Sequence, residues 1–343
     1  MNSGENIMPS VTTRRDFLKN ASFAAGAGLV TGLSLTGENT SVEAAELNNN
    51  LESQKAIPVV DTHQHLWDLS KFNLPWLKND AVQAINRNFV MSDYLKATKG
   101  ANVVKTVYME VNVHPSQQAK EAEYVIDLCK RDDNPMRGAV IGGYPHEKNF
   151  AKYAERFGKN KYIKGFRTVL HDPDRPKGLC LQPRFVENMK LLGEMGLSFD
   201  LCMRPDEILD GVKLAEKCPN TRFVIDHCGN MSVTSTDKKV REKWEKGIKE
   251  AAALKNTVCK ISGIVVTARK GTWKPSDLAP NMNFCMDAFG EDRAYFGGDW
   301  PVCTLRATFV QWVDALKWIV RNRSAKFQRK LFHDNAVKFY RLG

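Results

Sequence analysis

The stretch VVDTHQHLWD, from Val59 to Asp68, places two histidines two residues apart at the end of an apolar run. Residues two apart in a β-strand point to the same face, so His63 and His65 are predicted to share a face with Asp61 and Val59. The pair is a candidate metal site, a candidate catalytic pair, or two alternating residues of the core. The rest of the chain has to decide between these alternatives.

Seven further apolar runs follow at intervals suited to one strand and one helix. They are VVKTVYMEVNV (103–113), MRGAVIGGY (136–144), YIKGFRTVL (162–170), LSFDLCM (197–203), RFVIDHCG (222–229), VCKISGIV (258–265) and RAYFGGDWP (293–301). With the first run at 58–67 they predict an α/β fold in which eight strands alternate with helices, a parallel (β/α)8 TIM barrel. The alternative is a doubly wound open sheet. That fold usually has a glycine-rich phosphate turn after its first strand, where this chain has HQHLWD.

Segments with charged outer faces separate these runs. The helix-like ones include residues 116–131, 183–196 and 236–255, and a closing helix is predicted over 324–342. The long connection from residue 67 to 102 is predicted to fold over the mouth of the barrel.

Polar side chains stand at the ends of other predicted strands. Arg167 shares a face with Gly165 on the fourth strand, and Asp299 shares one with Tyr295 and Gly297 on the eighth. Barrel enzymes place their chemistry at the carboxyl ends of the strands, so these side chains are predicted to meet at the mouth.

The sixth strand adds His227, predicted to share a face with Phe223 and Ile225. Burying several charged or polar groups together costs free energy unless they serve one another or a ligand. A functional site explains such a cluster, and a purely structural polar network is the alternative.

The segments DTHQHLWD, GFRTVL, VIDHCGN, CKISG and YFGGDWPV occur in this order along the chain. They resemble the motifs of the amidohydrolase-2 branch of the amidohydrolase superfamily, and especially its fuconolactonase-like sugar lactonases. The resemblance runs from about residue 57 to 342 and implies a barrel that hydrolyses a lactone or a related carbonyl compound. It implies that Asp299 is the general base for the attacking water. It also implies which side chains surround the substrate carbonyl and its developing oxyanion: His63, His65, Arg167 and His227.

The chemistry suits these residue types independently of the resemblance. Water is a weak nucleophile and needs a base in contact with it, a role that Asp299 can fill. The carbonyl oxygen gains negative charge as water adds, so it needs fixed hydrogen-bond donors or a metal. Arg167 can also bind a carboxylate through two parallel hydrogen bonds.

The resemblance leaves the question of a metal open. The positions that bind the metal in metal-bearing members correspond here to His63, His65, His227 and Asp299. Three histidines with one aspartate suit zinc or a looser manganese site. The fifth strand, LSFDLCM, lacks the histidine or lysine that those members place there, and offers only Asp200 and Cys202. In this it resembles lactonases that work without a tightly bound metal. The two alternatives are no required cofactor, or one divalent metal, Zn or Mn.

Four more residues are candidates for contact with a small-molecule substrate, predicted to be a sugar lactone or an acidic sugar derivative. Trp67 and Trp300 flank two of the motifs, and sugar rings often lie on indoles; core packing is the alternative. Glu110 and His114 follow the second strand and are candidates to line the mouth. A surface role is the alternative for each.

Residues 1–44 are predicted to be a twin-arginine signal peptide, which leaves one domain over residues 45–343. TRRDFLKN (13–20) pairs two arginines, an uncharged run of small residues extends from 21 to 35, and a small-residue exit VEA ends at Ala44. An amphipathic N-terminal helix is the alternative. The prediction is export by the twin-arginine machinery to the periplasm or the medium, without a stable membrane anchor, because the apolar run is short.

The formal net charge is +11, and the basic residues are spread along the chain without a dense run. This distribution favours general attraction for anionic small molecules and predicts no nucleic-acid partner. None of the eight cysteines forms a Cys-x-x-Cys motif, and their pairing stays open. Two other functions remain as alternatives to a lactonase: a metal-dependent decarboxylase on the same fold, and a non-catalytic periplasmic binder of sugar acids.

Overall fold

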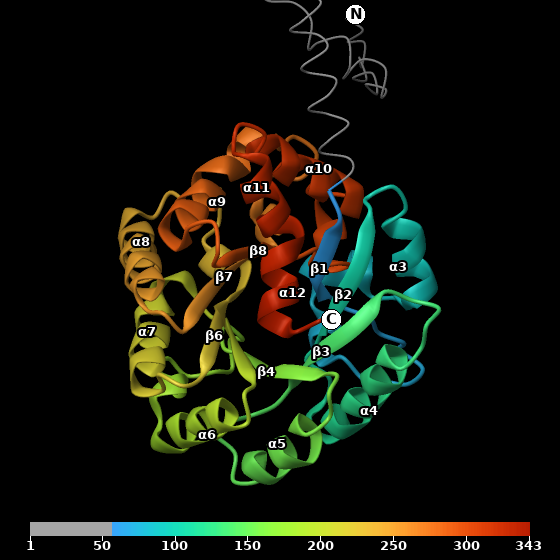
Figure 1. Ribbon diagram of the computed structural model, residues 1–343, viewed down its shortest axis with the longest axis vertical. Helices are drawn as coiled ribbons and strands as arrows, with labels where there is room; N and C mark the ends of the chain where they lie inside the picture. The colour runs from blue at the N-terminus through green and yellow to red at the C-terminus, as the bar shows by residue number, and fades with distance from the viewer. Residues whose placement is uncertain (1–56) are drawn as a thin grey trace, which may run out of the picture. The chain divides into compact units, whose positions relative to one another are not determined.

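The computed structural model describes residues 57–343. The predicted leader at 1–44 and the predicted start of the domain at residue 45 lie outside the described residues. Between 57 and 343, eight strands form one sheet in chain order, with helices around its outer side (Figure 1). Neighbouring strands from first to last pair in parallel. The predicted (β/α)8 barrel is confirmed.

Each strand overlaps one of the eight predicted apolar runs. The strands are β1 (Val59–Gln64), β2 (Val103–Met109), β3 (Met136–Gly142), β4 (Ile163–Val169), β5 (Ser198–Cys202), β6 (Arg222–Ile225), β7 (Thr257–Ile261) and β8 (Ala294–Phe296). A bridge between Gln64 and Trp300 closes the ring from β8 to β1.

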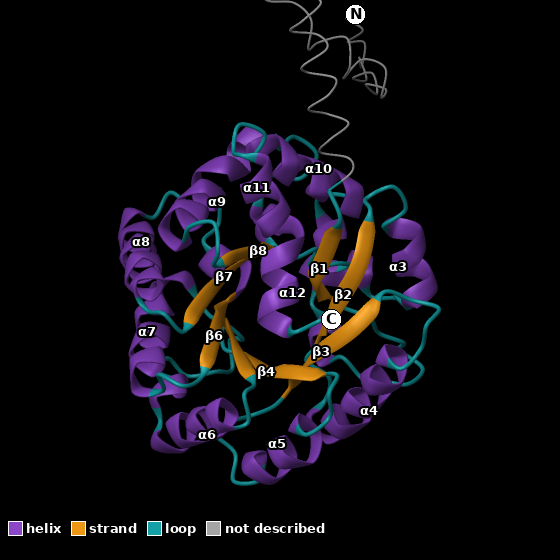
Figure 2. Ribbon diagram, in the orientation of Figure 1, coloured by secondary structure: helices purple, strands orange, loops and turns teal. Residues whose placement is uncertain are grey.

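Helices cover the outer face of the strands, as the purple ribbons of Figure 2 show. The α-helices of the described residues are α3 (Met91–Ala97), α4 (Gln118–Cys129), α5 (Phe150–Gly158), α6 (Pro183–Glu194), α7 (Ile208–Lys217), α8 (Lys238–Ala253), α9 (Pro275–Phe289), α10 (Phe309–Ile319), α11 (Ala325–Arg329) and α12 (Asn335–Tyr340), of which α12 lies at one end of the barrel. The closing helix predicted over 324–342 is divided in two, because a π-helical turn, Lys330–Asp334, separates α11 from α12. Among the described residues, no helix is long and apolar enough to span a membrane.

Helix α12 closes the end of the barrel at which the strands begin; it lies in the centre of the ring in Figure 1. Its Tyr340 is buried, and the Tyr340 hydroxyl lies 3.2 Å from that of Tyr295 inside the barrel. Lys105, near the start of β2, donates to the Leu342 carbonyl at 3.3 Å. Arg222, at the start of β6, donates to the Phe339 carbonyl. The open mouth is therefore at the opposite end, where the strands finish.

Strand β1 does not alternate as the sequence predicts. Its pairing with β2 is irregular between Val59 and Val60 and again between Asp61 and Gln64. Val60 packs with the apolar residues inside the barrel, whereas Val59 belongs to the core between sheet and helices. Asp61 accepts a hydrogen bond at 2.8 Å from Tyr94 of α3, and so turns outward. The prediction that Val59 and Asp61 share a face with His63 is wrong, because an irregular strand resets the alternation.

The connection from β1 to β2 lies beside the mouth. It contains two 3-10 helices, Pro75–Lys78 and Asp80–Ile85, before α3. Trp76 Nε1 donates to the Val111 carbonyl at 2.7 Å, just beyond the end of β2. This contact holds the connection at the end of the barrel where it was expected.

Candidate functional site

Four of the predicted site residues converge at the mouth. Asp299 Oδ1 lies 3.3 Å from His65 Nε2 and 3.7 Å from His63 Nε2. The ring of His227 stands 4.4 Å from that of His63, centroid to centroid. His63 is fully buried, and His65 and Asp299 are each only 5% exposed. The first, sixth and eighth strand segments thus contribute to one cluster.

Arg167, on β4, completes the cluster. Its Nη1 lies 3.2 Å from His63 Nε2. Its Nε donates to Glu110 Oε1 at 2.7 Å, and its Nη2 donates to the Glu110 carbonyl at 2.8 Å. Glu110, expected as a substrate contact, is buried and fixes the guanidinium of Arg167 instead. Burial opposes the charge of Arg167, but Glu110 outweighs it and raises the pKa of the guanidinium.

His227 reaches the site by a route that the sequence does not predict. β6 ends at Ile225, and Phe223 and Ile225 pack outward in the core between sheet and helices. His227 has φ +52°, and the following Cys228 and Gly229 also have positive φ. This left-handed turn directs the imidazole to Ser262, whose Oγ lies 2.9 Å from His227 Nδ1. The predicted shared strand face is wrong, although the predicted meeting with His63 occurs.

Asp299 also lies beyond its strand, in a left-handed conformation with φ +52°. β8 ends at Phe296, and the amide of Gly298 donates to Asp61 Oδ1 at 2.6 Å, which anchors the segment. Gly263 packs against the Asp299 carboxylate. A Cβ placed at Gly263 would lie 2.9 Å from Asp299 Oδ2 and 2.3 Å from His227 Nδ1. The site therefore requires a glycine at position 263.

The contacts of His65 indicate where its ring carries a proton. Nδ1 lies 3.0 Å from the Met109 carbonyl, which can only accept, so Nδ1 donates. The second nitrogen, Nε2, faces the Asp299 carboxylate.

Beneath His63 lies a charged network that the sequence analysis did not identify. Asp226 Oδ1 is 3.7 Å from His63 Nδ1 and 3.0 Å from Lys260 Nζ. Lys260 also donates to Asp200 Oδ2 at 2.6 Å, and all four side chains are fully buried. Charged residues within apolar runs, such as Lys260 in VCKISGIV, were the available signal, because a buried charge requires a partner.

Burial and charge set the ionisation of this network. Burial alone would raise the pKa of Asp226, but the charges of Lys260 and Arg167 outweigh it and hold the pKa at about 2. Burial and the neighbouring cationic groups lower the pKa of His63 well below its usual value. His63 is therefore neutral beside an ionised Asp226.

Two predicted substrate contacts lie in an aromatic core instead. Trp67 is fully buried and packs edge-on against Trp76 and Phe89, and its Nε1 donates to the Arg87 carbonyl at 2.6 Å. Trp300 is 2% exposed and packs against Phe89. Neither indole presents a free face, so the geometry does not support a role in stacking on a sugar ring.

His114 is exposed on the surface and caps a short turn. Its Nδ1 accepts from the Ser116 amide at 3.4 Å and lies 2.9 Å from the Ser116 hydroxyl. His114 therefore has the surface position that was the alternative to lining the mouth. All eight cysteines lie in the described part of the chain, and all are buried and unpaired.

The donors at the mouth fit a divalent metal in number and spacing. One atom each of His63, His65 and Asp299 lie within 4.8 Å of one another. Tetrahedral zinc, with bonds of about 2.0–2.1 Å, sets its ligand atoms about 3.3 Å apart and leaves a fourth position for water or substrate. The lone pair of His63 Nε2 is, however, the acceptor for Arg167, so a metal there would require the guanidinium to move.

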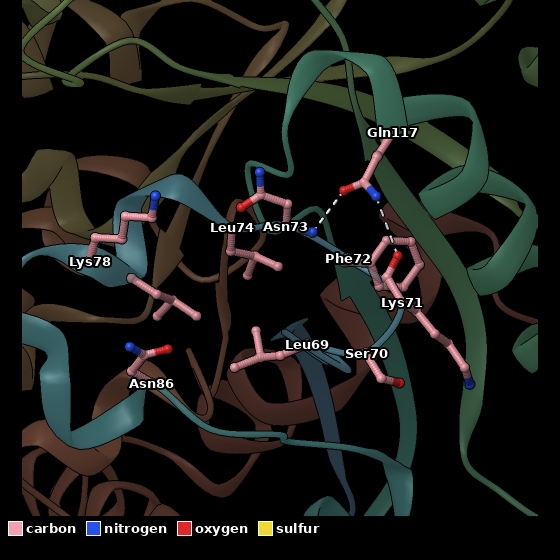
Figure 3. A pocket seen from close by; sticks show the side chains of 10 residues that line it. Leu69, Ser70, Lys71, Phe72, Asn73, Leu74, Lys78, Asn86 and Gln117 are labelled. Atoms are coloured by element: carbon pink, nitrogen blue, oxygen red, sulfur yellow. Dashed lines mark hydrogen bonds between the residues drawn. The ribbon is translucent and has the colours of Figure 1, made fainter.

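A separate hollow of about 410 Å3 lies at the surface of the β1–β2 connection (Figure 3). Lys71, Asn73 and Lys78 are among the residues that line it, and Gln117 accepts from the Asn73 amide at 2.7 Å. Its lining shares no residue with the His–Asp cluster, so the two are distinct features of the mouth end.

Known proteins resemble the chain over most of its length. It is 25% identical over 294 residues to an L-fucono-1,5-lactonase of Burkholderia multivorans, covering 82% of this chain and 96% of the relative. It is 29% identical over 306 residues to an uncharacterized protein of Sinorhizobium fredii, covering 83% of this chain and 99% of the relative. The crystal structure of an amidohydrolase from Burkholderia multivorans with bound zinc superposes with a TM-score of 0.74 at 21% identity. That match covers 83% of this chain and 100% of the other, and it shows a shared fold.

Residues 60–342 match the Amidohydro_2 family, whose description is amidohydrolase. The matched region contains all eight strands except Val59, the first residue of β1, and every residue of the mouth cluster. The resemblance seen in the ordered motifs is thereby confirmed. The chain belongs to the amidohydrolase family of (β/α)8-barrel enzymes.

Proposed function

We propose that this amidohydrolase-family enzyme opens the lactone of a sugar acid by directed attack of water. The observation that carries the proposal is the convergence of Asp299, His63 and His65 within 3.7 Å at the mouth, beside Arg167. The 25% identity to an L-fucono-1,5-lactonase supports the lactone class.

In the proposed reaction, Asp299 takes one proton from water as the oxygen attacks the lactone carbonyl carbon. The carbonyl oxygen becomes an oxyanion, and the Arg167 guanidinium and neighbouring imidazoles stabilise it. The intermediate then collapses and breaks the bond to the ring oxygen, which receives the proton from Asp299. The new carboxylic acid ionises and releases a proton to solvent, so turnover acidifies the medium.

The site also fits a metal held by His63, His65 and Asp299, with His227 beside them. Such an ion would polarise the carbonyl and lower the pKa of a bound water. We propose that turnover does not require it, because Arg167 already supplies a positive charge at His63 Nε2. A decarboxylase on this fold would need a firmly held metal, so the same contact disfavours that alternative.

The experiment is a panel of aldonic and uronic acid lactones followed by proton release, with the purified wild type and Asp299→Asn. The wild type is expected to hydrolyse at least one lactone, and Asp299→Asn to lose about 100- to 10,000-fold in rate. Asp127→Asn, which changes an exposed carboxylate of α4, is the matched control. Failure across a broad panel would overturn the proposal.

Two outcomes would favour the alternatives. Calorimetric binding of a sugar acid by the wild type without turnover would favour the non-catalytic binder. Release of carbon dioxide from an acidic substrate, dependent on added metal, would favour the decarboxylase.

A further inference from the structure

We propose that Asp226, held in place by Lys260, is a positioning residue that fixes the tautomer of His63. In this tautomer Nδ1 carries the proton and the Nε2 lone pair points toward Arg167 and the reacting atoms. The proposal deepens the proposed function and concerns the same site. Its main measurement is made on the resting protein, so it can fail or succeed independently of lactone turnover.

Arg167 contacts the Nε2 atom of His63. A guanidinium has five N–H donors and no acceptor, so Arg167 Nη1 at 3.2 Å must donate to a lone pair on Nε2. An imidazole with a lone pair on Nε2 has its single proton on Nδ1. The contact with Arg167 therefore indicates that the proton of His63 is on Nδ1.

Asp226 faces the opposite side of the His63 ring. His63 Nδ1 has no hydrogen-bond partner, and the carboxylate of Asp226 is ion-paired with Lys260 but accepts no hydrogen bond. Nδ1 and Asp226 Oδ1 face one another at 3.7 Å, and both side chains are fully buried. A hydrogen bond of ordinary length needs them to approach by only about 0.5–1 Å. Each buried group is the natural partner of the other, since an unpaired one is costly.

Two cationic side chains hold Asp226 in its orientation. Lys260 Nζ lies 3.0 Å from Asp226 Oδ1 and is held from the other side by Asp200 Oδ2 at 2.6 Å. Arg167 Nη1 lies 3.6 Å from Asp226 Oδ2. Two cations therefore keep Asp226 a carboxylate, which can accept from His63 but cannot donate to it.

An amide in place of the carboxylate disturbs this arrangement. Asp226 Oδ1 faces both Lys260 Nζ and His63 Nδ1, and Oδ2 faces Arg167 Nη1. In Asp226→Asn the NH2 group therefore takes either the Oδ1 position, where it is a donor toward His63 Nδ1, or the Oδ2 position, where it opposes Arg167. The first placement favours a proton on Nε2, and the second displaces the guanidinium from the Nε2 lone pair. Either placement weakens the preference for Nδ1–H.

The test is 15N NMR of protein labelled at histidine nitrogen, treated with a chelator so that no metal fixes the ring. The chain has seven histidines, and His63 is assigned by the signal that disappears in His63→Gln. The wild type is expected to show Nδ1–H. Asp226→Asn is expected to move His63 partly or wholly to Nε2–H and to lower kcat about 10- to 100-fold, with a smaller effect on KM.

Glu121→Gln is the matched control, because Glu121 is also a buried carboxyl near Arg167 but makes no contact with His63. It should keep the wild-type tautomer. If Asp226→Asn does not fold, Lys260→Gln replaces it: mixed tautomers of His63 support the proposal, and an unchanged Nδ1–H overturns it. A wild-type ring protonated at Nε2, or an Asp226→Asn protein with unchanged tautomer, overturns it as well. A lactone panel that fails while the tautomer shifts as expected would overturn only the proposed function.

Discussion

At the scale of single residues, the site is built on backbone that most side chains avoid. His227 and Asp299 both have φ +52°, and Gly263, which touches both, has φ +61°. Non-glycine residues in this region carry a conformational cost that the surrounding structure has to offset, and such residues gather at functional sites. The turns that carry the chemistry are therefore also sites of strain.

Replacing Gly263 with alanine should remove activity. The new Cβ would lie 2.3 Å from His227 Nδ1 and 2.9 Å from Asp299 Oδ2, so one of these side chains must move. Gly271→Ala is the control, because it has a similar φ of +76° but nothing within 4 Å of the added atom. Both variants should lose about 1–2 kcal/mol of stability, and only Gly263→Ala should lose kcat. Equal kcat values for the two would contradict the close packing.

Removal of metal tests the role of Arg167. Because Arg167 already occupies the His63 Nε2 lone pair, chelated protein is expected to keep its lactonase rate. Arg167→Gln frees that lone pair and should bind more zinc, measured by elemental analysis after dialysis. A wild type that loses its rate on chelation and regains it with zinc or manganese would show that the metal is required.

At the scale of elements, the sequence predicts the strands better than the direction of their side chains. All eight apolar runs become strands, because alternating strands and helices leave a parallel barrel few competitors. The mouth residues were found by assuming regular alternation. That assumption fails in β1, where the register is irregular, and after β6, where a left-handed turn carries His227. The sequence did not identify Asp226 as a site residue, because its ion pair is with Lys260, which lies on β7 and is distant in the chain.

Helix α12 should matter for stability rather than for the reaction. Tyr340 is 1% exposed at the closed end of the barrel, so Tyr340→Ala should lower the free energy of unfolding by about 3–5 kcal/mol. Trp318→Ala, at a residue 43% exposed on α10, should change it by less than about 0.5 kcal/mol. Urea titration measures both, and KM should not change in either. A Tyr340→Ala protein as stable as the wild type would contradict the packing.

At the scale of the whole molecule, stability should depend on the pH through Glu121. Burial, and then the charge of Glu110, raise the pKa of Glu121 from 4.5 to about 8. A carboxyl with a raised pKa stabilises the fold fully below its unfolded value, and this contribution is lost as the pH rises through 8. The slope approaches about 1.4 kcal/mol per pH unit between these values. Glu121→Gln should remove this slope in urea titrations from pH 5 to 8; the same slope in both proteins would contradict it.

The sequence of the N-terminal segment predicts where the protein works. We propose that Arg14 and Arg15 direct export by the twin-arginine route. Replacing both with lysine should leave the longer precursor inside the cell, whereas Lys19→Arg should be exported normally. Fractionation and immunoblotting measure this, and normal export of the double variant would rule out the route.

The closure of the barrel by α12 has a practical consequence. Gly343 contacts Lys105 on the side of the molecule away from the mouth. A flexible tether added after Gly343 would therefore attach the protein to a resin or an electrode with its catalytic opening turned outward. An immobilised preparation of this kind should admit substrate as freely as the dissolved protein does.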